Sequence, residues 1–447
     1  MNMIILGLGA NIGDRLYHLR KALQAIKAIP HLTVQHVSPV YLSDALLPDH
    51  APRDWDQPYL NAALRCETTL DPLELLQQLK NIEWSIGRKP EVRHWGPRIL
   101  DIDILAWDDK IIKNDALTIP HENLLKRPFA LWPLADLSPF WRFPLRGPYE
   151  NKTAAELVAS WGSRFTGQAP FHTKQINQRI DMPQLVGILN ITPDSFSDGG
   201  KFLSPDHALV HMIKLIASGA EIIDIGAQST APHATIVGEK EEWLRLQPVL
   251  SALPSIKNQF VITPKISVDT FHASVAAKAL RLNVDWINDV SGLKEPAMIS
   301  LLAQSNADCV MMHHLGIPAS SHQVLSYDQD LLKLIYEWAE KQLNKLECAG
   351  MKREKIIFDP GIGFGKIAEH SLQLIKHINE FKNLGVRLLV GHSRKSFLSL
   401  FTNRAVLDRD VETMVTSLYL ANQSVDYLRV HHVELCARGM KVAAALL

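Results

Sequence analysis

Two aspartates, Asp101 and Asp103, stand two residues apart in a strand-like run over residues 100–107. Side chains alternate along a strand, so both carboxylates project from the same face. Adjacent carboxylates repel each other unless a cation lies between them, and magnesium is the natural cation where a nucleotide polyphosphate binds. An isolated Asp-x-Asp pair most often marks a solvated strand face. Here, however, the chain supplies several phosphate-compatible donors, namely Arg88, Arg93, Arg98, His121 and Arg127.

A second set of polar residues follows eight short apolar runs in the later part of the chain. The runs cover residues 186–189, 222–225, 265–268, 286–287, 309–312, 356–358, 388–390 and 427–430. Eight such runs, each followed by a helical pattern, predict a TIM barrel. Because TIM-barrel active sites lie at the carboxyl ends of the strands, the polar residues after these runs are expected to converge on one mouth.

The residues at this mouth divide by the chemistry that they can do. Donors and acceptors that suit the edge of a nitrogen heterocycle come from Asp269, Asn288 and Asp359. A polar ligand and cationic donors that suit a polyphosphate with a bound metal come from Asn190, Arg429 and His431. Lys395 lies between the two sets. Any one aspartate could instead cap the next helix, but a polar residue at all eight strand ends is harder to explain that way.

The chain divides into two differently patterned parts. Residues 1–162 mix helical stretches near 15–29 and 72–86 with strand-like runs, which predicts an α+β sandwich. The strand-like runs are 3–7, 33–42, 61–68 and 100–107, and Asp14 and Asp71 stand where helix N-caps are expected. Residues 163–182 turn polar and non-periodic, which predicts a linker. Residues 183–447 carry the predicted barrel.

The composition narrows the class of protein. The 447 residues include 47 basic and 47 acidic side chains, and this balance favours neither nucleic-acid nor membrane-surface binding. Four scattered cysteines without metal or disulfide spacing fit a reducing compartment. No uncharged run approaches the roughly 20 residues that span a bilayer. The N-terminus lacks the basic segment of a signal peptide, so we expect a cytoplasmic protein.

The second part resembles the dihydropteroate synthase family over essentially all of residues 183–447. The resemblance rests on six motifs in the family's order, at residues 190–200, 267–270, 288–289, 359–366, 393–396 and 429–431. It implies a pterin slot formed by Asp269, Asn288, Met312, Asp359 and Lys395, of which Asp269, Asp359 and Lys395 would be catalytic. It also implies that pyrophosphate, with one magnesium ion on Asn190, is held by Asn190, Thr230, Arg429 and His431. The p-aminobenzoate site would consist of Phe364, Lys395 and Ser396.

The first part resembles the hydroxymethyl-dihydropterin pyrophosphokinase family over about residues 3–160. The motifs are residues 7–11, 57–63, 95–104 and 120–123. The resemblance implies a ferredoxin-like fold and two magnesium ions on Asp101 and Asp103, with Arg88 and Arg98 also catalytic. The implied ATP contacts are Glu83, Arg88, Arg98, His121 and Arg127. The implied pterin contacts are Tyr59, Asn61 and Phe129.

Several positions depart from the two family patterns. In the synthase part, Gln228, Ala231 and His432 stand where the family usually has Glu, Arg and Asp, which implies a less direct grip on pyrophosphate. In the kinase part, the residues that differ are Pro90, His94 and Glu122. Pro90 and His94 lie in a loop that is expected to close over ATP, so the rate could suffer.

Together the resemblances imply a bifunctional folate-biosynthesis enzyme. It would transfer pyrophosphate from ATP to 6-hydroxymethyl-7,8-dihydropterin and then condense the product with p-aminobenzoate to 7,8-dihydropteroate. Sulfonamides would compete with p-aminobenzoate, and a homodimer through the barrel is expected. One alternative is a pterin-binding barrel of the methyltetrahydrofolate methyltransferase type, and another is a chain with one active half. The tandem histidines at 313–314 and 431–432 leave a zinc hydrolase as a minor alternative.

Overall fold

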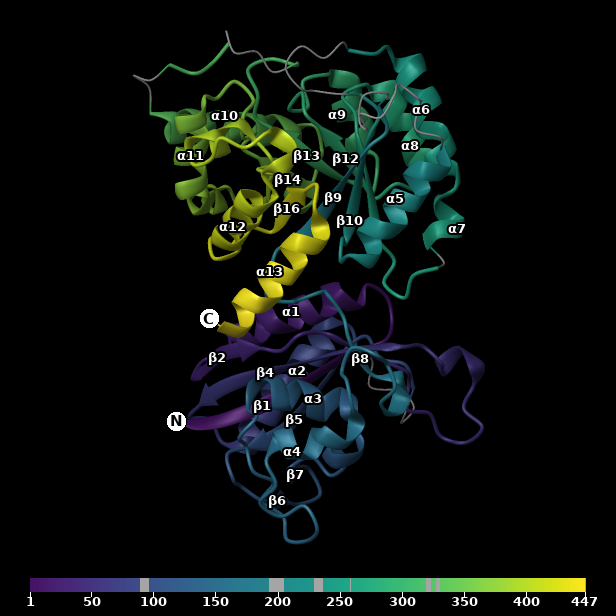
Figure 1. Ribbon diagram of the computed structural model, residues 1–447, viewed down its shortest axis with the longest axis vertical. Helices are drawn as coiled ribbons and strands as arrows, with labels where there is room; N and C mark the ends of the chain where they lie inside the picture. Colours follow the sequence, from purple (N-terminus) through teal and green to yellow (C-terminus); the bar gives the residue numbers. More distant parts are fainter. Residues whose placement is uncertain are drawn as a thin grey trace. The chain divides into compact units, whose positions relative to one another are not determined.

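The computed structural model describes residues 1–88, 96–192, 205–228, 236–257, 259–318, 323–326 and 330–446. They form two compact units, Met1–Asp181 and Met182–Leu447, each built on its own sheet (Figure 1). Most of the segment predicted as a linker belongs to the first unit, because its strand β8 (Lys174–Gln175) pairs antiparallel with β3 (Tyr41–Ser43).

The first unit is a ferredoxin-like α+β sandwich, as predicted. Its sheet is antiparallel with the order β5-β1-β4-β3-β8, and β2 also pairs with β4. The remaining strands are β1 (Asn2–Ala10), β2 (Leu32–Val37), β4 (Tyr59–Thr68) and β5 (Asp101–Trp107), with a separate hairpin of β6 (Ile112–Lys113) and β7 (Thr118–Ile119). The helices are α1 (Arg15–Lys27), α2 (Pro72–Ile86), α3 (Pro128–Leu137) and α4 (Ala154–Val158).

Both predicted N-caps are present. The Asp14 carboxylate accepts a hydrogen bond from the Tyr17 N–H at 3.1 Å, and the Asp71 carboxylate accepts one from the Leu73 N–H at 2.9 Å. Helix α2 ends at Gly87, whose φ of 119° is a conformation that favours glycine. Local sequence therefore fixes both ends of the helix that precedes the aspartate strand.

The predicted strand over residues 33–42 is wrong as a single element. It is divided into β2 and β3, because Pro39 has no N–H to give to the sheet. At the break, the Ser38 hydroxyl accepts the Ala63 N–H at 2.8 Å in place of a main-chain carbonyl. The strand therefore changes course before β3, whose last residue, Ser43, lines the cavity described below.

The two faces of this sheet are covered unequally. Helices α1 and α2 pack against one face, while α3 and α4 bury a cluster with Ile5 and Leu105 on the other. Asp101 and Asp103 share the face of Leu105, beside the start of α3. The open part of that face holds the aspartates.

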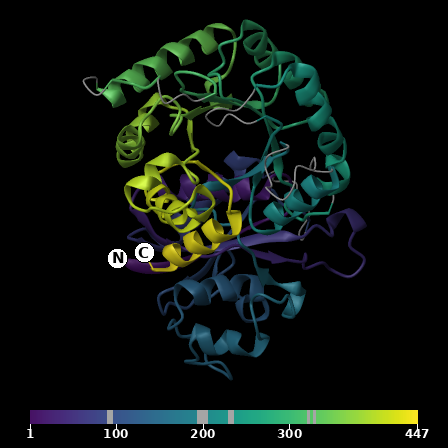
Figure 2. The same cartoon turned by 45° about the horizontal axis from the view of Figure 1, so that its top comes forward.

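The second unit is a closed barrel of parallel strands, which confirms the predicted TIM fold. All eight predicted runs lie within its strands, which are β9 (Gln184–Asn190), β10 (Ile222–Gly226), β11 (Lys265–Asp269), β12 (Trp286–Asp289), β13 (Asp308–Met312), β14 (Ile356–Asp359), β15 (Arg387–Val390) and β16 (Tyr427–Val430). Figure 2 shows helices around these strands. They are α5 (Pro205–Ala217), α6 (Glu239–Ser251), α7 (Leu253–Lys257), α8 (Ala273–Arg281), α9 (Pro296–Ala303), α10 (Leu331–Cys348), α11 (Ala368–Lys376), α12 (Asp410–Ala421) and α13 (Val433–Leu446).

A buried apolar layer fills the barrel near the amino ends of its strands. Its members are Val186, Ile222, Trp286, Val310, Ile357, Leu389 and Tyr427. The Trp286 and Tyr427 rings meet edge to face, with centroids 4.8 Å apart. Access to the barrel is therefore from the carboxyl ends of the strands. No helix in the described part of the chain is both long enough and apolar enough to cross a membrane.

Replacing Trp286 by Ala should destabilise the barrel by about 3–5 kcal/mol, because it empties a site that no neighbour can refill. Denaturant unfolding followed by far-UV circular dichroism measures the change in free energy of unfolding. The matched control is Trp84→Ala, since the Trp84 side chain is half exposed. A loss at Trp286 no larger than that of the control would show that this layer does not hold the barrel together.

Candidate active sites

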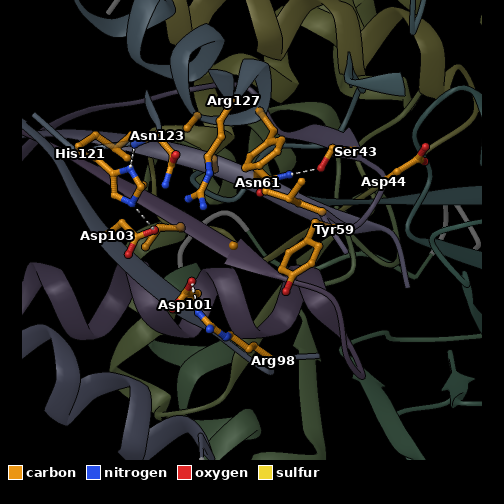
Figure 3. A pocket seen from close by; sticks show the side chains of 18 of the residues that line it. Ser43, Asp44, Tyr59, Asn61, Arg98, Asp101, Asp103, His121, Asn123 and Arg127 are labelled. Carbon is orange, nitrogen blue, oxygen red and sulfur yellow. Dashed lines mark hydrogen bonds and ion pairs between the residues drawn. The ribbon is translucent and has the colours of Figure 1, made fainter. Parts of the chain in front are cut away.

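A cavity of about 310 Å³ opens on the α3 side of the first sheet (Figure 3). Its floor is β1, where Gly9 pairs with Asp101 and Gly7 with Asp103. A Cβ on Gly9 would stand 3.4 Å from the Asn61 side-chain oxygen, so a larger residue would narrow the cavity. The predicted site residues that line it are Tyr59, Asn61, Arg98, Asp101, Asp103, His121, Arg127 and Phe129.

The two aspartates have unequal surroundings. Asp101 accepts hydrogen bonds from Arg98 at 2.7 Å and Arg88 at 2.9 Å. Burial alone would raise the pKa of Asp101, but the Arg98 charge and its neighbours outweigh burial and lower it. Asp103 has a weaker partner, His121 at 3.9 Å, and burial together with the Asp101 charge raises the pKa of Asp103 to about 7. This uncompensated carboxylate is suited to a cation.

The resemblance implies an ATP contact for Glu83, but Glu83 is not among the described residues that line the cavity. Its side chain is fully buried under β5, where it accepts the Ile102 N–H at 2.7 Å. It also pairs with Lys80 at 2.8 Å and closely with Arg88. Glu83 therefore holds Arg88 against Asp101, and its contact with ATP stays a prediction.

Uncharged polar side chains also line the cavity. Asn61 donates to the Ser43 hydroxyl at 3.0 Å, next to Tyr59. Ser43 and Asn123 also line the cavity, although neither was predicted as a site residue. Asn123 lies within the motif at residues 120–123, whereas Ser43 lies outside every motif. Burial, followed by the Arg127 charge, lowers the pKa of His121, so its imidazole is neutral at pH 7. Pro90 and His94 lie outside the described residues.

In the barrel, strand register aligns the predicted site residues at the carboxyl ends. Gly226 pairs with Asn190 on one side and Asp269 on the other, and Asp269 pairs with Asn288. Met312 pairs with Asp359 in the same manner. The structure therefore brings the predicted heterocycle-binding residues to one mouth.

Arg429 lies at the centre of this mouth. Its Nε donates to Asp224 at 2.6 Å and its Nη2 to Asp269 at 3.0 Å. Asp224, buried in β10, also accepts hydrogen bonds from Asn288 at 3.0 Å and Ser267 at 2.6 Å. The sequence analysis missed Asp224, although an aspartate inside an isoleucine-rich strand is itself a signal. Burial, followed by the Asp224 charge, raises the pKa of Asp269 to about 8.

Lys395 and Asp359 form the other side of the mouth. The Lys395 ammonium lies 4.4 Å from the centroid of the Phe364 ring, a cation–π contact. Burial, followed by the Arg429 charge, lowers the pKa of Lys395 to about 8. Burial raises the pKa of Asp359 to about 6, although this carboxylate accepts the Gly361 N–H at 2.7 Å. Met312 packs with Phe364 in a small apolar cluster.

The other three predicted site residues of the barrel differ in their surroundings. His431 shares a hydrogen bond with the Ser393 hydroxyl at 2.9 Å, and burial lowers its pKa to about 3. Ser396 is exposed at the start of a 3₁₀ turn just after Lys395. Thr230 lies outside the described residues, as does Ala231.

A buried lysine, Lys366, was also missed. Its ammonium contacts His313 Nδ1 at 2.8 Å and the Phe364 carbonyl at 3.0 Å. Burial, followed by the Lys366 charge, lowers the pKa of His313 to about 2, so this ring is a neutral acceptor. Lys366 therefore fastens the glycine-rich loop that carries Phe364 to the end of β13.

Comparison with known proteins gives the same division of the chain. Residues 5–139 match the family of 7,8-dihydro-6-hydroxymethylpterin-pyrophosphokinase, and residues 186–431 match the family of pterin binding enzymes. The folate synthesis bifunctional protein of Chlamydia muridarum is 39% identical, over 99% of this chain and 98% of its own. The mitochondrial folate synthesis bifunctional protein of Arabidopsis thaliana is 35% identical, over 99% of this chain and 83% of its own.

Solved structures match the barrel. Dihydropteroate synthase from Anaplasma phagocytophilum, with bound 6-hydroxymethylpterin-monophosphate, is 40% identical over 60% of this chain and 100% of its own, with a TM-score of 0.55. The Yersinia pestis enzyme with a sulfonamide drug is 34% identical over 60% of this chain and 96% of its own, with a TM-score of 0.55. The chain therefore belongs to the bifunctional folate-synthesis family, with a hydroxymethyl-dihydropterin pyrophosphokinase domain followed by a dihydropteroate synthase domain.

Proposed function

We propose that the cavity of the first unit binds 6-hydroxymethyl-7,8-dihydropterin and ATP together. The observation that carries this is the mixed lining of the cavity. Tyr59, Asn61 and Phe129 supply flat and amide surfaces for the pterin. Arg98, His121 and Arg127 supply phosphate donors, and Asp101 pairs with both Arg88 and Arg98.

The reaction in this half needs no side-chain nucleophile. The pterin hydroxyl attacks the β-phosphorus of ATP, and AMP leaves. The protein contributes position and fixed positive charge, because both substrates lie in one cavity and guanidinium groups already face the phosphates. Tyr59 and Asn61 orient the pterin, while Arg98 and Arg127 stabilise the charge on the transferred group.

Two magnesium ions on Asp101 and Asp103 fit the part of the cavity that these aspartates line. The raised pKa of Asp103 reflects a negative charge that no described side chain neutralises well. Within the described residues, no group of three or more His, Cys, Asp or Glu side chains could hold a metal. ATP phosphates and water would therefore complete the coordination, as is common for magnesium. Bound there, the ions would neutralise phosphate charge.

In the barrel, we propose that the pterin ring lies against Asp269, Asn288, Asp359, Met312 and Lys395. Arg429, Asn190, His431 and Thr230 would hold its diphosphate, with one magnesium ion on Asn190. Arg429 fits this role because its guanidinium is already fixed where charge develops on departing pyrophosphate. The amine of p-aminobenzoate, lying between Phe364, Lys395 and Ser396, then attacks the exposed carbon. Sulfonamides would occupy the same place.

This assignment explains the chain better than the alternatives. A methyltransferase-type barrel has no need of an attached pyrophosphokinase domain, and both domains match their families. The product of the first half is the substrate of the second, which gives a reason for the fusion.

We propose that the protein is located in the cytoplasm.

Replacing Asp101 and Asp103 together by Ala should lower pyrophosphoryl transfer by roughly a thousandfold or more, because the metal ligands and their charge are lost. AMP release from ATP and hydroxymethyl-dihydropterin measures it. Dihydropteroate formation from supplied pterin pyrophosphate should persist. The matched control is the exposed pair Asp109→Ala with Asp115→Ala. Unchanged AMP release in the active-site variant would refute the metal assignment.

Replacing Lys395 by Ala should lower kcat/KM for condensation roughly a hundredfold while leaving AMP release intact. In the unaltered chain, kcat/KM should fall as pH rises through about 8, because Lys395 is cationic below its pKa and neutral above it. Lys395→Arg should move that fall to higher pH. The exposed Lys376→Ala serves as the control. A pH profile flat from 7 to 9.5 would contradict the need for this charge.

We also propose a homodimer through the barrel. On α12, Val411 is 61% exposed, and Val415 and Tyr419 continue the same face at four-residue spacing. Val415→Asp should convert a dimer into a monomer, as measured by light scattering, whereas Val210→Asp, at an exposed position of α5, should not. If the unaltered chain is monomeric at micromolar concentration, the dimer proposal is wrong, and the proposals for the two activities still stand.

A further inference from the structure

Residues 163–181 lie outside both family matches, yet they are part of the kinase unit. Strand β8 in this segment pairs with β3, with Leu42 opposite Lys174. The next residues after Leu42 are Ser43 and Asp44, which line the cavity. The segment is thus attached to the strand that forms one end of the proposed pterin pocket.

Several contacts fasten the segment on both sides of β8. Arg164 makes a close ion pair with Asp136 on α3, and the Tyr41 hydroxyl donates to the same carboxylate at 2.7 Å. The Ile176 N–H donates to the Val40 carbonyl at 2.9 Å. Thr173 is fully buried, and its hydroxyl donates to the Pro170 carbonyl at 2.8 Å within the segment. The contacts of Arg164 and Ile176 with the rest of the unit are not those of a free connector.

Between these anchors, a 3₁₀ turn over Pro170–His172 reaches the pocket wall. The Phe171 ring meets the edge of Phe129, with centroids 5.5 Å apart and an interplanar angle of 68°. The Phe171 carbonyl accepts the Asp44 N–H at 2.8 Å. Phe129 and Asp44 both line the cavity, and Figure 3 shows Asp44 on the side away from Asp103. Phe171 itself stands behind this lining.

The backbone of the turn is held in an unusual conformation. Phe171 has a φ of 60° and His172 a φ of 43°, values that bulky residues seldom adopt. Such a conformation persists where surrounding contacts over-determine it, and it often occurs beside binding sites. Here it turns the Phe171 ring toward Phe129 and its carbonyl toward Asp44.

We infer that Phe171 is a positioning residue of the kinase reaction, which fixes the Phe129 ring and the Asp44 main chain so that the pocket holds a flat pterin. This rests on the proposed pterin site. We expect the contribution to be larger for the pterin than for ATP, because Phe129 is a proposed pterin contact and Asp44 lies on the side of the cavity away from Asp101 and Asp103 (Figure 3). The pair of His172 with Asp44 at 2.5 Å adds little, because both side chains are mostly exposed.

The test uses the full chain and steady-state AMP release, with the pterin and MgATP varied separately. Phe171→Ala should raise the pterin KM roughly tenfold, about 1.4 kcal/mol, and leave the ATP KM within a factor of two. Phe171→Leu, which keeps most of the bulk, should restore much of the loss. Phe140→Ala, at an 85% exposed aromatic of the same unit, is the matched control. His172→Ala should change the pterin KM less than twofold.

A double-mutant cycle separates this inference from the proposed function. If Phe171 acts through Phe129, the double variant should bind the pterin no worse than Phe129→Ala alone. A normal pterin KM in Phe129→Ala would remove the proposed pterin site itself. A raised KM in Phe129→Ala with a normal KM in Phe171→Ala would overturn the inference and leave the function standing. Equal rises in the pterin and ATP KM would show a general loss of structure, which also overturns it.

Discussion

Buried carboxylates that must share guanidinium groups are the constraint on which both active sites depend. Arg429 lies between Asp224 and Asp269 in the barrel, and Arg88 lies between Glu83 and Asp101 in the kinase unit. Burying such charges costs free energy unless oppositely charged partners and hydrogen bonds compensate them. Removing one partner leaves the other as an uncompensated buried charge. These arginines therefore have a structural role in holding the strands together, in addition to the phosphate contacts that we propose for them.

In each site this sharing leaves one carboxylate under-compensated. The pKa of Asp103 and that of Asp269 are both raised, first by burial and then by a neighbouring acid. The two sites relieve this in different ways. Under the proposed functions, Asp103 would gain a metal ion beside ATP, whereas Asp269 would face a ring whose N–H groups are donors. The same imbalance would then serve metal binding in one half and recognition of a heterocycle in the other.

Close approach of the backbone is the second feature that the sites share. The kinase cavity has glycines of β1 as its floor, and the barrel mouth uses Gly226 and Gly391 beside its acids. A Cβ on Gly226 would lie 3.6 Å from the Asp269 Cβ, and one on Gly391 would lie 3.6 Å from an Asp359 oxygen. Larger side chains at these glycines would lie against the acidic residues to which we assign ligand binding. The two unrelated sheets therefore share glycines beside their acidic residues.

The sequence predicted the strand ends well, because a period of two and parallel pairing follow from local pattern. It missed Asp224 because the partner, Arg429, is 205 residues away and the barrel must close before they meet. It did not predict that Glu83 is fully buried, because a helical position does not reveal which neighbour covers the side chain. It took the segment with Phe171 for a linker because a two-residue edge strand has no periodicity to detect.

The departure at Gln228 shows how a substitution can be compensated within the fold. Gln228 donates to the buried Glu242 carboxylate at 3.4 Å, where a second carboxylate would instead repel it. Glu242 also contacts His272 at 2.6 Å and Thr270 at 3.1 Å. Gln228 follows β10, and Thr270 directly follows Asp269 at the end of β11. Because both side chains donate to it, the buried Glu242 carboxylate connects the ends of β10 and β11. With Gln in place of Glu at this position, the loop has one charge fewer and the ends of the two strands stay connected.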